Sequence, residues 1–207
     1  MIRIDNACIT YNDKILFRGL SLHVQKGETV CISGESGSGK TSLLKAILGF
    51  VPLAEGTIQV DGITLTAQTT EKIRRRVTYI PQELSFPTEW VKEMVMLPFE
   101  LKANHSSLFS KERLFENFRL LGLSEELYEK RVGEISGGQK QRIMLAVSAL
   151  LDKPLFIADE PTSALDVESA HKVLSFFQHR AQEGQTLIMV SHDKELAAGC
   201  NRTFTLH

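Results

Sequence analysis

The chain has 207 residues, of which 43% are hydrophobic and 24% are charged. At this length one domain is expected, and folding buries roughly 70% of the unfolded chain's surface, so a stable core needs neither a disulfide nor a metal. The 24 lysines and arginines are matched by 25 aspartates and glutamates, which argues against a nucleic-acid-binding protein, since these usually carry a strongly basic domain or stripe.

The first part of the chain predicts short strands. Residues 1–33 alternate apolar and polar side chains, with a turn signal at Asn12-Asp13. The apolar run at residues 29–33 indicates a compact buried strand that ends at a glycine. Apolar side chains then recur at helical spacing over residues 43–48, and Gly49 is placed to end that helix.

The middle of the chain changes character. Residues 56–65 predict a hairpin with Asp61-Gly62 as its turn. Residues 84–130 carry Phe, Leu, Glu and Lys at helical spacing, with Pro87 and Pro98 as punctuation, and therefore predict a helical lobe.

The last third alternates helices and strands. Helices are expected over residues 143–151 and 173–183, and buried strands over residues 155–158 and 186–190. Such alternation implies a mostly parallel sheet that is covered on both faces. The sequence thus predicts an α/β fold with an N-terminal antiparallel β region and an inserted helical lobe.

A glycine-rich segment lies between the predicted strand at 29–33 and the predicted helix at 43–48. Such loops wrap closely around phosphates, and backbone N–H groups at a helix start donate to phosphate oxygens. Lys40 would reach the β- and γ-phosphates, and Thr41 would ligate Mg²⁺. A phosphate-binding loop of this kind does not by itself distinguish GTPases, kinases and motor ATPases. Its residues fit GxxxxGK[ST]: Gly34, Glu35, Ser36, Gly37, Ser38, Gly39, Lys40 and Thr41.

Two carboxylates follow the apolar strand at residues 155–158. Asp159 at the strand end would hold the shell of Mg²⁺, usually through water. Glu160 could polarise an attacking water, a role worth about 10²–10⁴ in rate. The alternative is a purely structural role, in which the two carboxylates cap a loop.

A second candidate anion site precedes the predicted helix at 143–151. Ser136-Gly137-Gly138-Gln139 would place a hydroxyl and backbone N–H groups at a helix start. A chain that already has one phosphate loop does not require a second anion site to bind its own nucleotide. The alternative is that Ser136 simply caps the helix.

Together these residues resemble the ABC ATPase family, in order along essentially the whole chain. The resemblance identifies residues 34–41, with Ser42 after them, as the Walker A loop of a P-loop NTPase core, and Ser136 to Gln139 as the signature motif that occurs only in this family. Asp159 and Glu160 match the Walker B motif and its following base.

The resemblance also assigns roles to four further residues. It places Tyr11 against the adenine, Gln82 in the Q-loop, Asp166 in the D-loop and His192 as the switch histidine. Tyr11, the loop from Gly34 to Ser42, the signature residues and Asp166 would then contact ATP. Thr41, Gln82 and Asp159 would serve Mg²⁺, and Glu160, His192 and Gln82 would serve catalysis. Tyr11 could instead be an ordinary strand aromatic, Gln82 a turn residue and His192 a core histidine.

Function and partners follow from the same resemblance. It implies a transporter subunit that hydrolyses ATP, forms a head-to-tail homodimer or heterodimer through its nucleotide sites, and drives a separate membrane permease. One domain is expected, with a nucleotide-binding core at 1–83 and 146–207 and the lobe at 84–145. Phe86, Pro87, Trp90 and Phe99 would line a groove for the permease or, alternatively, fill the lobe's core.

Rival functions remain open. A non-transport ABC ATPase of DNA repair or translation would be expected to carry a coiled-coil insertion or tandem cassettes. A P-loop kinase or GTPase would not need Ser136 to Gln139. We expect no nucleic-acid partner.

Cysteine usage and hydropathy predict the compartment. Cys8, Cys31 and Cys200 form no CxxC pair, so reduced thiols are expected. Arg3 and Asp5 interrupt any N-terminal apolar run, and no apolar stretch reaches the about 18 residues of a spanning helix. A soluble, cytoplasmic chain is expected, held at the inner face of the cell membrane by the permease.

Overall fold

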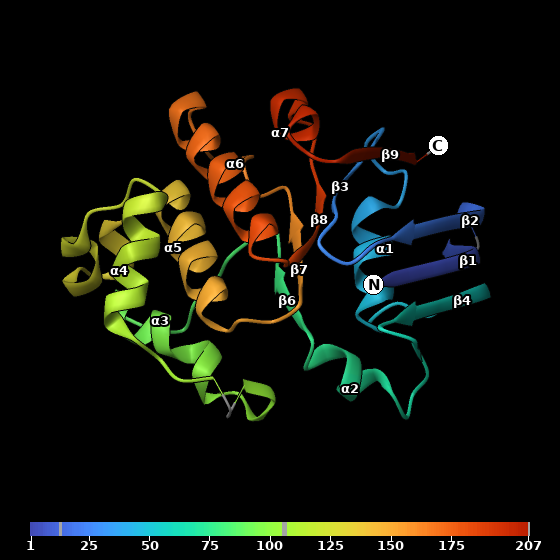
Figure 1. Cartoon of the computed structure of the whole chain (residues 1–207), viewed down its shortest axis with the longest axis horizontal. Coiled ribbons are helices and arrows are strands. Elements are labelled where there is room, and N and C mark those ends of the chain that lie inside the picture. The colour runs from blue at the N-terminus through green and yellow to red at the C-terminus, as the bar shows by residue number, and fades with distance from the viewer. Residues whose placement is uncertain (13, 105–106, 207) are drawn as a thin grey trace.

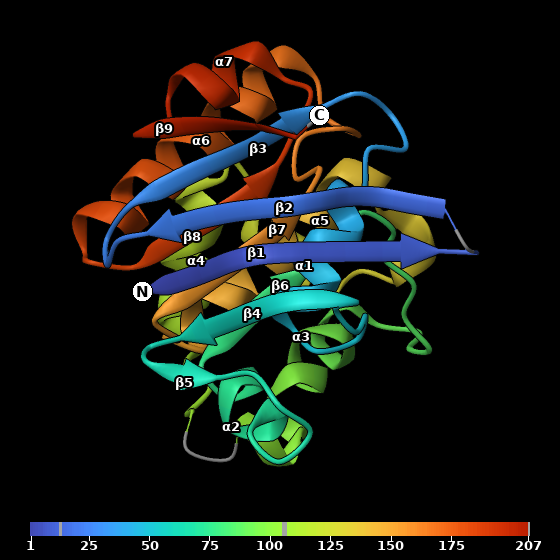
Figure 2. The same ribbon diagram turned by 90° about the vertical axis from the view of Figure 1, so that its right-hand side faces the viewer.

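The computed structural model describes residues 1–12, 14–104 and 107–206. An antiparallel sheet forms one layer, with strand order β2-β1-β4-β5, and Figure 2 shows it from its open face. Its hairpin turn is confirmed, because Asp61 and Gly62 take left-handed φ values of 49° and 72°. Asp13, half of the predicted turn at Asn12-Asp13, lies outside the described residues. The strands are β1 (Ile2–Tyr11), β2 (Lys14–Val24), β4 (Glu55–Val60) and β5 (Ile63–Thr64).

A second sheet forms the centre of the molecule, with strand order β6-β7-β8-β3-β9. The pairs β6–β7, β7–β8, β8–β3 and β3–β9 are all parallel. The expected parallel sheet and N-terminal antiparallel region are thus confirmed. The strands are β3 (Thr29–Gly34), β6 (Val77–Ile80), β7 (Leu155–Asp159), β8 (Thr186–Val190) and β9 (Arg202–Leu206).

Helices cover both faces of the parallel sheet (Figure 1). Helix α1 (Lys40–Ile47) lies between the two sheets, and α2 (Thr70–Arg74) precedes β6. The lobe contains α3 (Val91–Glu100), α4 (Lys111–Leu120) and three short 3-10 helices, η1 (Lys102–Asn104), η2 (Glu125–Glu129) and η3 (Val132–Glu134). Helices α5 (Gly137–Leu150), α6 (Val167–Gln182) and α7 (Lys194–Ala198) complete the other face. No helix in the described ranges is long and apolar enough to cross a bilayer.

Two hydrophobic clusters, one on each face of the parallel sheet, fix the position of β7. Leu155 and Ile157 pack with α1 and the antiparallel sheet, whereas Phe156 and Ala158 pack with α5, α6 and the lobe. Every residue of β7 is buried, as expected for a strand covered on both faces. The strand end that carries Asp159 is therefore held rigidly.

Several predicted boundaries were wrong. Helix α5 begins at Gly137 instead of residue 143, and α6 begins at Val167 instead of residue 173. Pro98 does not end a helix but lies inside α3, where Asn104 Nδ2 donates to its carbonyl at 2.7 Å. Helix α5 also runs unbroken past residue 145, the expected end of the lobe, and the division of the chain into a core and a lobe stays a prediction.

Candidate nucleotide site

The loop between β3 and α1 needs glycine at two positions for different reasons. A Cβ on Gly34 would lie 2.5 Å from the carbonyl oxygen of Leu206 on β9. Gly39 has a φ of 96° at the N-cap of α1, a left-handed conformation that side chains rarely adopt. The loop can therefore lie close to β9 and turn directly into the helix, with the backbone N–H groups of the first turn free of side-chain caps.

The Lys40 side chain lies back across this loop. Its Nζ donates to the carbonyl oxygens of Gly34 and Glu35 at 2.9 and 2.8 Å, and only 7% of the residue is exposed. Ser38 Oγ is buried in the same loop without a hydrogen-bond partner among the described residues. An unpaired hydroxyl beside a fixed ammonium is a polar environment suited to an anion.

Asp159 ends β7 beneath the loop. It is 1% exposed, and within the described part of the chain its Oδ1 accepts no hydrogen bond. Burial raises the pKa of Asp159, while the Thr41 hydroxyl and the charges of Lys45 and Lys40 act in the opposite direction. A buried carboxylate oxygen without a partner, beside a threonine hydroxyl, is the hard oxygen set that Mg²⁺ prefers. The residues present therefore fit that ion.

Glu160 has an unusual backbone. Its φ of 49° lies in the left-handed region, a strain that costs about 1–3 kcal/mol for a non-glycine residue. Its N–H donates to the carbonyl of Val190 at 2.9 Å. Such strain in a buried residue indicates that the surrounding structure holds the side chain in one orientation.

The Glu160 carboxylate faces His192. Oε1 lies 3.3 Å from His192 Nε2, and Oε2 accepts from the His192 backbone N–H at 3.4 Å. Burial raises the pKa of Glu160, and nearby His192 lowers it. The histidine side chain itself is 58% exposed, so the predicted alternative of a core histidine is wrong.

One cavity of about 620 Å³ joins most of these groups. Tyr11, which is 67% exposed, lies at one part of its rim, and the exposed Gln82 lines another. Tyr11 is thus available for stacking and is not packed into the sheet. The predicted residues that line the cavity are Tyr11, Ser36, Gly37, Gly39, Lys40, Thr41, Ser42, Gln82, Asp159, Glu160 and His192.

Other predicted residues lie outside this cavity. Gly34, Glu35 and Ser38 shape the loop without lining the hollow, and Asp166 is the N-cap of α6. The Asp166 carboxylate accepts from the Ser169 N–H and hydroxyl at 2.8 and 2.9 Å, and these bonds lower its pKa. A nucleotide contact by Asp166 stays a prediction.

The segment from Ser136 to Gln139 also lies outside the cavity. Ser136 is the N-cap of α5: its Oγ accepts from the Gln139 N–H at 3.1 Å, and Gln139 Oε1 accepts from the Ser136 N–H at 2.9 Å. The helix-cap interpretation is therefore correct for the single chain. Yet Ser136 and Gly137 are exposed, and no atom of the described residues lies within 4 Å of a Cβ built on Gly137. The capped start of α5 is therefore exposed to solvent at Ser136 and Gly137.

Six cavity residues were not predicted. Thr162 and Ser163 follow the two carboxylates, and Ser191 and Asp193 flank His192, so closeness to a predicted residue would have found them. Val190 is the last residue of β8. Leu16 on β2 has no signal in the sequence, since it reaches the site only because the antiparallel sheet packs against the loop. The six are Leu16, Thr162, Ser163, Val190, Ser191 and Asp193.

Comparison with known proteins gives consistent matches. The family model for the ABC transporter matches residues 17–163. The glutamate/aspartate import ATP-binding protein GltL of Escherichia coli (strain K12) is 34% identical over 200 residues, which cover 95% of this chain and 83% of that protein. The bacitracin export ATP-binding protein BceA of Halalkalibacterium halodurans is 33% identical over 92% of this chain and 77% of its own length.

Solved structures agree. A bacterial ABC transporter cassette solved as a dimer superposes with a TM-score of 0.86 at 30% identity, over 100% of this chain and 94% of that one. A dimeric ATP-binding cassette in a post-hydrolysis state, bound to ADP and Pi, gives the same TM-score at 28% identity and the same coverage.

Proposed function

The chain belongs to the ABC transporter family as an ATP-binding and ATP-hydrolysing subunit, and on that premise we propose which of its residues perform each step. ATP binds in the cavity beside Lys40, whose ammonium exchanges the carbonyls of Gly34 and Glu35 for phosphate oxygens. Backbone N–H groups of residues 34–42 supply the remaining donors, and the dipole of α1 favours the negative charge. Tyr11 stacks on the adenine from the rim, a contact worth about 1–3 kcal/mol.

Thr41, Gln82 and Asp159 would hold Mg²⁺. When bound, the ion neutralises charge on the β- and γ-phosphates. The support on this chain is the unpartnered, buried Oδ1 of Asp159 and its neighbouring Thr41 hydroxyl. Gln82, which lines the cavity and is exposed, would supply a further oxygen to the ion.

Glu160 is the general base. Its carboxylate accepts a proton from water as the water oxygen attacks the γ-phosphorus, and the bond to the β-phosphate oxygen breaks with its electron pair on ADP. His192 positions that carboxylate through its ring and its backbone N–H. One observation supports this assignment above the others. Glu160 lies in the cavity with Lys40, its backbone is strained, and His192 contacts both oxygens of its carboxylate.

Two chains complete each other's sites head to tail. Within one chain the cavity lacks Ser136 to Gln139, although those residues offer an exposed hydroxyl and helix-start N–H groups. In the dimer, the α5 start of one copy covers the ATP of the other. The partner is a second copy or a related subunit.

The lobe receives the permease. A groove of about 600 Å³ on α3 is lined by apolar and charged side chains together. Of the four aromatic and proline candidates, Pro87 lines this groove, whereas Phe86 and Phe99 pack against the lobe's core, as the alternative predicted. Trp90 is half-buried, with Lys92 and Arg131 over its ring. The groove residues are Pro87, Thr88, Glu89, Lys92, Glu93, Met96, Leu97, Glu100 and Tyr128.

Docking on that groove would hold the chain at the inner face of the cell membrane. Relatives named for transport favour this function over DNA repair or translation. The test is co-purification of a membrane partner, followed by ATP-dependent transport with the wild type and with Glu160→Gln. Transport that survives loss of hydrolysis would refute the proposed coupling.

A further inference from the structure

The carbonyl oxygen of Glu160 is held by three hydrogen bonds. Gln141 Nε2 donates to it at 3.0 Å, and Ser163 donates twice, through Oγ at 3.0 Å and through its N–H at 3.2 Å. This is the residue with the left-handed backbone described above. Three donors on one carbonyl fix the orientation of a peptide group that would otherwise relax.

Gln141 reaches Glu160 from a different part of the chain. It lies on α5, five positions after Ser136, is 3% exposed, and makes a buried bond across 19 positions of sequence. It does not line the nucleotide cavity. Gln141 therefore touches the backbone of the proposed base without access to the nucleotide.

The start of α5 is packed against the loop that follows Glu160. A Cβ built on Gly138 would lie 3.0 Å from the Ala164 carbonyl oxygen and 2.8 Å from Leu165 Cδ2. So close a fit prevents the helix start from shifting without the loop. Ser136, Gln141 and Glu160 thus belong to one packed unit, with the exposed Ser136 at its outer end.

We propose that Gln141 is a positioning residue that orients Glu160 and couples it to α5, the helix that begins at the signature motif, in the same chain. The proposal rests on the proposed role of Glu160 as general base. When Ser136 of one copy contacts the partner's ATP, any movement of α5 is transmitted through Gln141 to Glu160 of the same copy. The ATP bound by one copy therefore influences the position of the catalytic base in the other copy.

Replacement of Gln141 by methionine removes the donor and keeps the size of the side chain. Without it only the two bonds from Ser163 hold the Glu160 carbonyl, so the peptide is less firmly fixed. A carboxylate displaced by about 1 Å is expected to lower kcat by about 10- to 100-fold. The KM for MgATP should change by less than about twofold, because Gln141 does not line the nucleotide cavity. Gln141→Asn, whose amide is one methylene shorter, should give the same split and provides a second variant should the first fold poorly.

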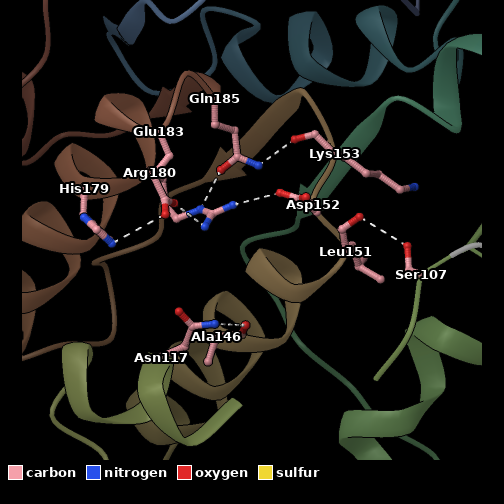
Figure 3. Close-up of polar contacts among 10 residues, drawn as sticks. All are labelled: Ser107, Asn117, Ala146, Leu151, Asp152, Lys153, His179, Arg180, Glu183 and Gln185. Atoms are coloured by element: carbon pink, nitrogen blue, oxygen red, sulfur yellow. Dashed lines mark hydrogen bonds and ion pairs between the residues drawn. The ribbon is translucent and has the colours of Figure 1, made fainter. Parts of the chain in front are cut away.

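Gln185→Met is the matched control. Gln185 is 5% exposed and donates Nε2 to the Lys153 carbonyl at 2.6 Å, just before the opposite end of β7 (Figure 3). It also accepts from Arg180 Nε at 3.1 Å, so its replacement breaks one more bond than Gln141→Met does. The control should lower the melting temperature at least as much, yet leave kcat within about twofold.

A double-mutant cycle with Glu160→Gln separates the two claims. In single-turnover assays, Gln141→Met should cause no further loss in the Glu160→Gln background, because it acts through that carboxylate. Wild-type kcat in Gln141→Met beside a slow Glu160→Gln would overturn the positioning role and leave the base intact. Equal kcat losses in Gln141→Met and Gln185→Met would mean that the loss comes from lower stability of the fold, and this result would also overturn the positioning role. A fast Glu160→Gln would instead remove the base assignment.

Discussion

Replacement of Glu160 by glutamine should separate ATP binding from hydrolysis. The amide keeps the volume of the carboxyl group and can still accept from the His192 backbone N–H, and the backbone bonds of Glu160 to Val190, Gln141 and Ser163 are unchanged. The ring of His192 is 58% exposed, so the loss of its contact with the carboxylate should cost only about 0–1 kcal/mol and the fold should survive.

The expected loss in rate is larger than the loss in stability. A positioned general base contributes about 10²–10⁴-fold, which is about 3–5 kcal/mol of barrier. Affinity for ATP should persist, because the hydrogen bonds that hold Lys40 go to the carbonyls of Gly34 and Glu35 and do not depend on the carboxylate. Removal of a negative charge beside the γ-phosphate should also favour the closed dimer.

Two assays decide this prediction. Phosphate release should fall at least about 10²-fold, and size-exclusion chromatography should show a dimer with ATP and a monomer without it. Asp159→Asn serves as the comparison, since loss of that buried carboxylate should weaken Mg²⁺-dependent binding itself. Rapid turnover in Glu160→Gln would mean that another group activates the water and would refute the assignment.

The other predictions concern the remaining groups of the site. Lys40→Ala should abolish tight MgATP binding in calorimetric titration without unfolding the chain; near-normal affinity would reject the phosphate-loop assignment. The acid limb of the kcat–pH profile should lie above the usual glutamate range, because burial raises the pKa of Glu160 and the base must be ionised. His192→Gln removes the group that lowers this pKa, so the acid limb should move to higher pH; a shift to lower pH would contradict the geometry. DNA should neither bind at physiological salt nor stimulate hydrolysis, since 24 basic residues against 25 acidic ones supply little of the electrostatic attraction that drives non-specific binding; clear stimulation would reopen a role in repair.

The central strands could be predicted because apolar runs bounded by glycine or charge have few alternatives. Residues 155–158 and 186–190 became β7 and β8 with at most one residue of error. The hairpin turn at Asp61-Gly62 was equally clear, since few dipeptides favour two successive left-handed residues.

Helix starts were harder to predict. Helix α5 begins with two glycines, which are typical of a loop, and the reciprocal bonds of Ser136 and Gln139 help to stabilise that turn. The first turns of α6, from Val167, are largely polar and exposed, so the apolar periodicity becomes visible only near Val173.

The site was predictable where its residues are adjacent in sequence. The loop from Gly34 to Ser42 and the pair Asp159-Glu160 are local motifs with a required spacing. The roles of Gln141 and Leu16 could not be predicted, because each residue reaches the surroundings of the site through packing between elements that are distant in sequence. The left-handed backbone of Glu160 was also hidden, since nothing in the neighbouring residues demands it.

Each active site is proposed to be shared between two chains, and a mixing experiment can test this sharing. Lys40→Ala removes a chain's own ATP site, and Ser136→Arg removes what it offers to its partner, so each variant alone should be inactive. A mixed dimer retains one intact site, made of the Lys40 loop of one variant and the Ser136 segment of the other. The other site of the mixed dimer combines the Lys40→Ala loop with the Ser136→Arg segment. It binds no ATP, so the larger side chain at position 136 meets no nucleotide there.

Equal amounts of the two inactive variants should therefore recover about a quarter of wild-type hydrolysis, if subunits assort at random and the sites act independently. Each variant measured alone at the same total concentration provides the baseline. Mixtures no more active than that baseline, with mixed dimers shown to form by affinity tags, would contradict the shared site.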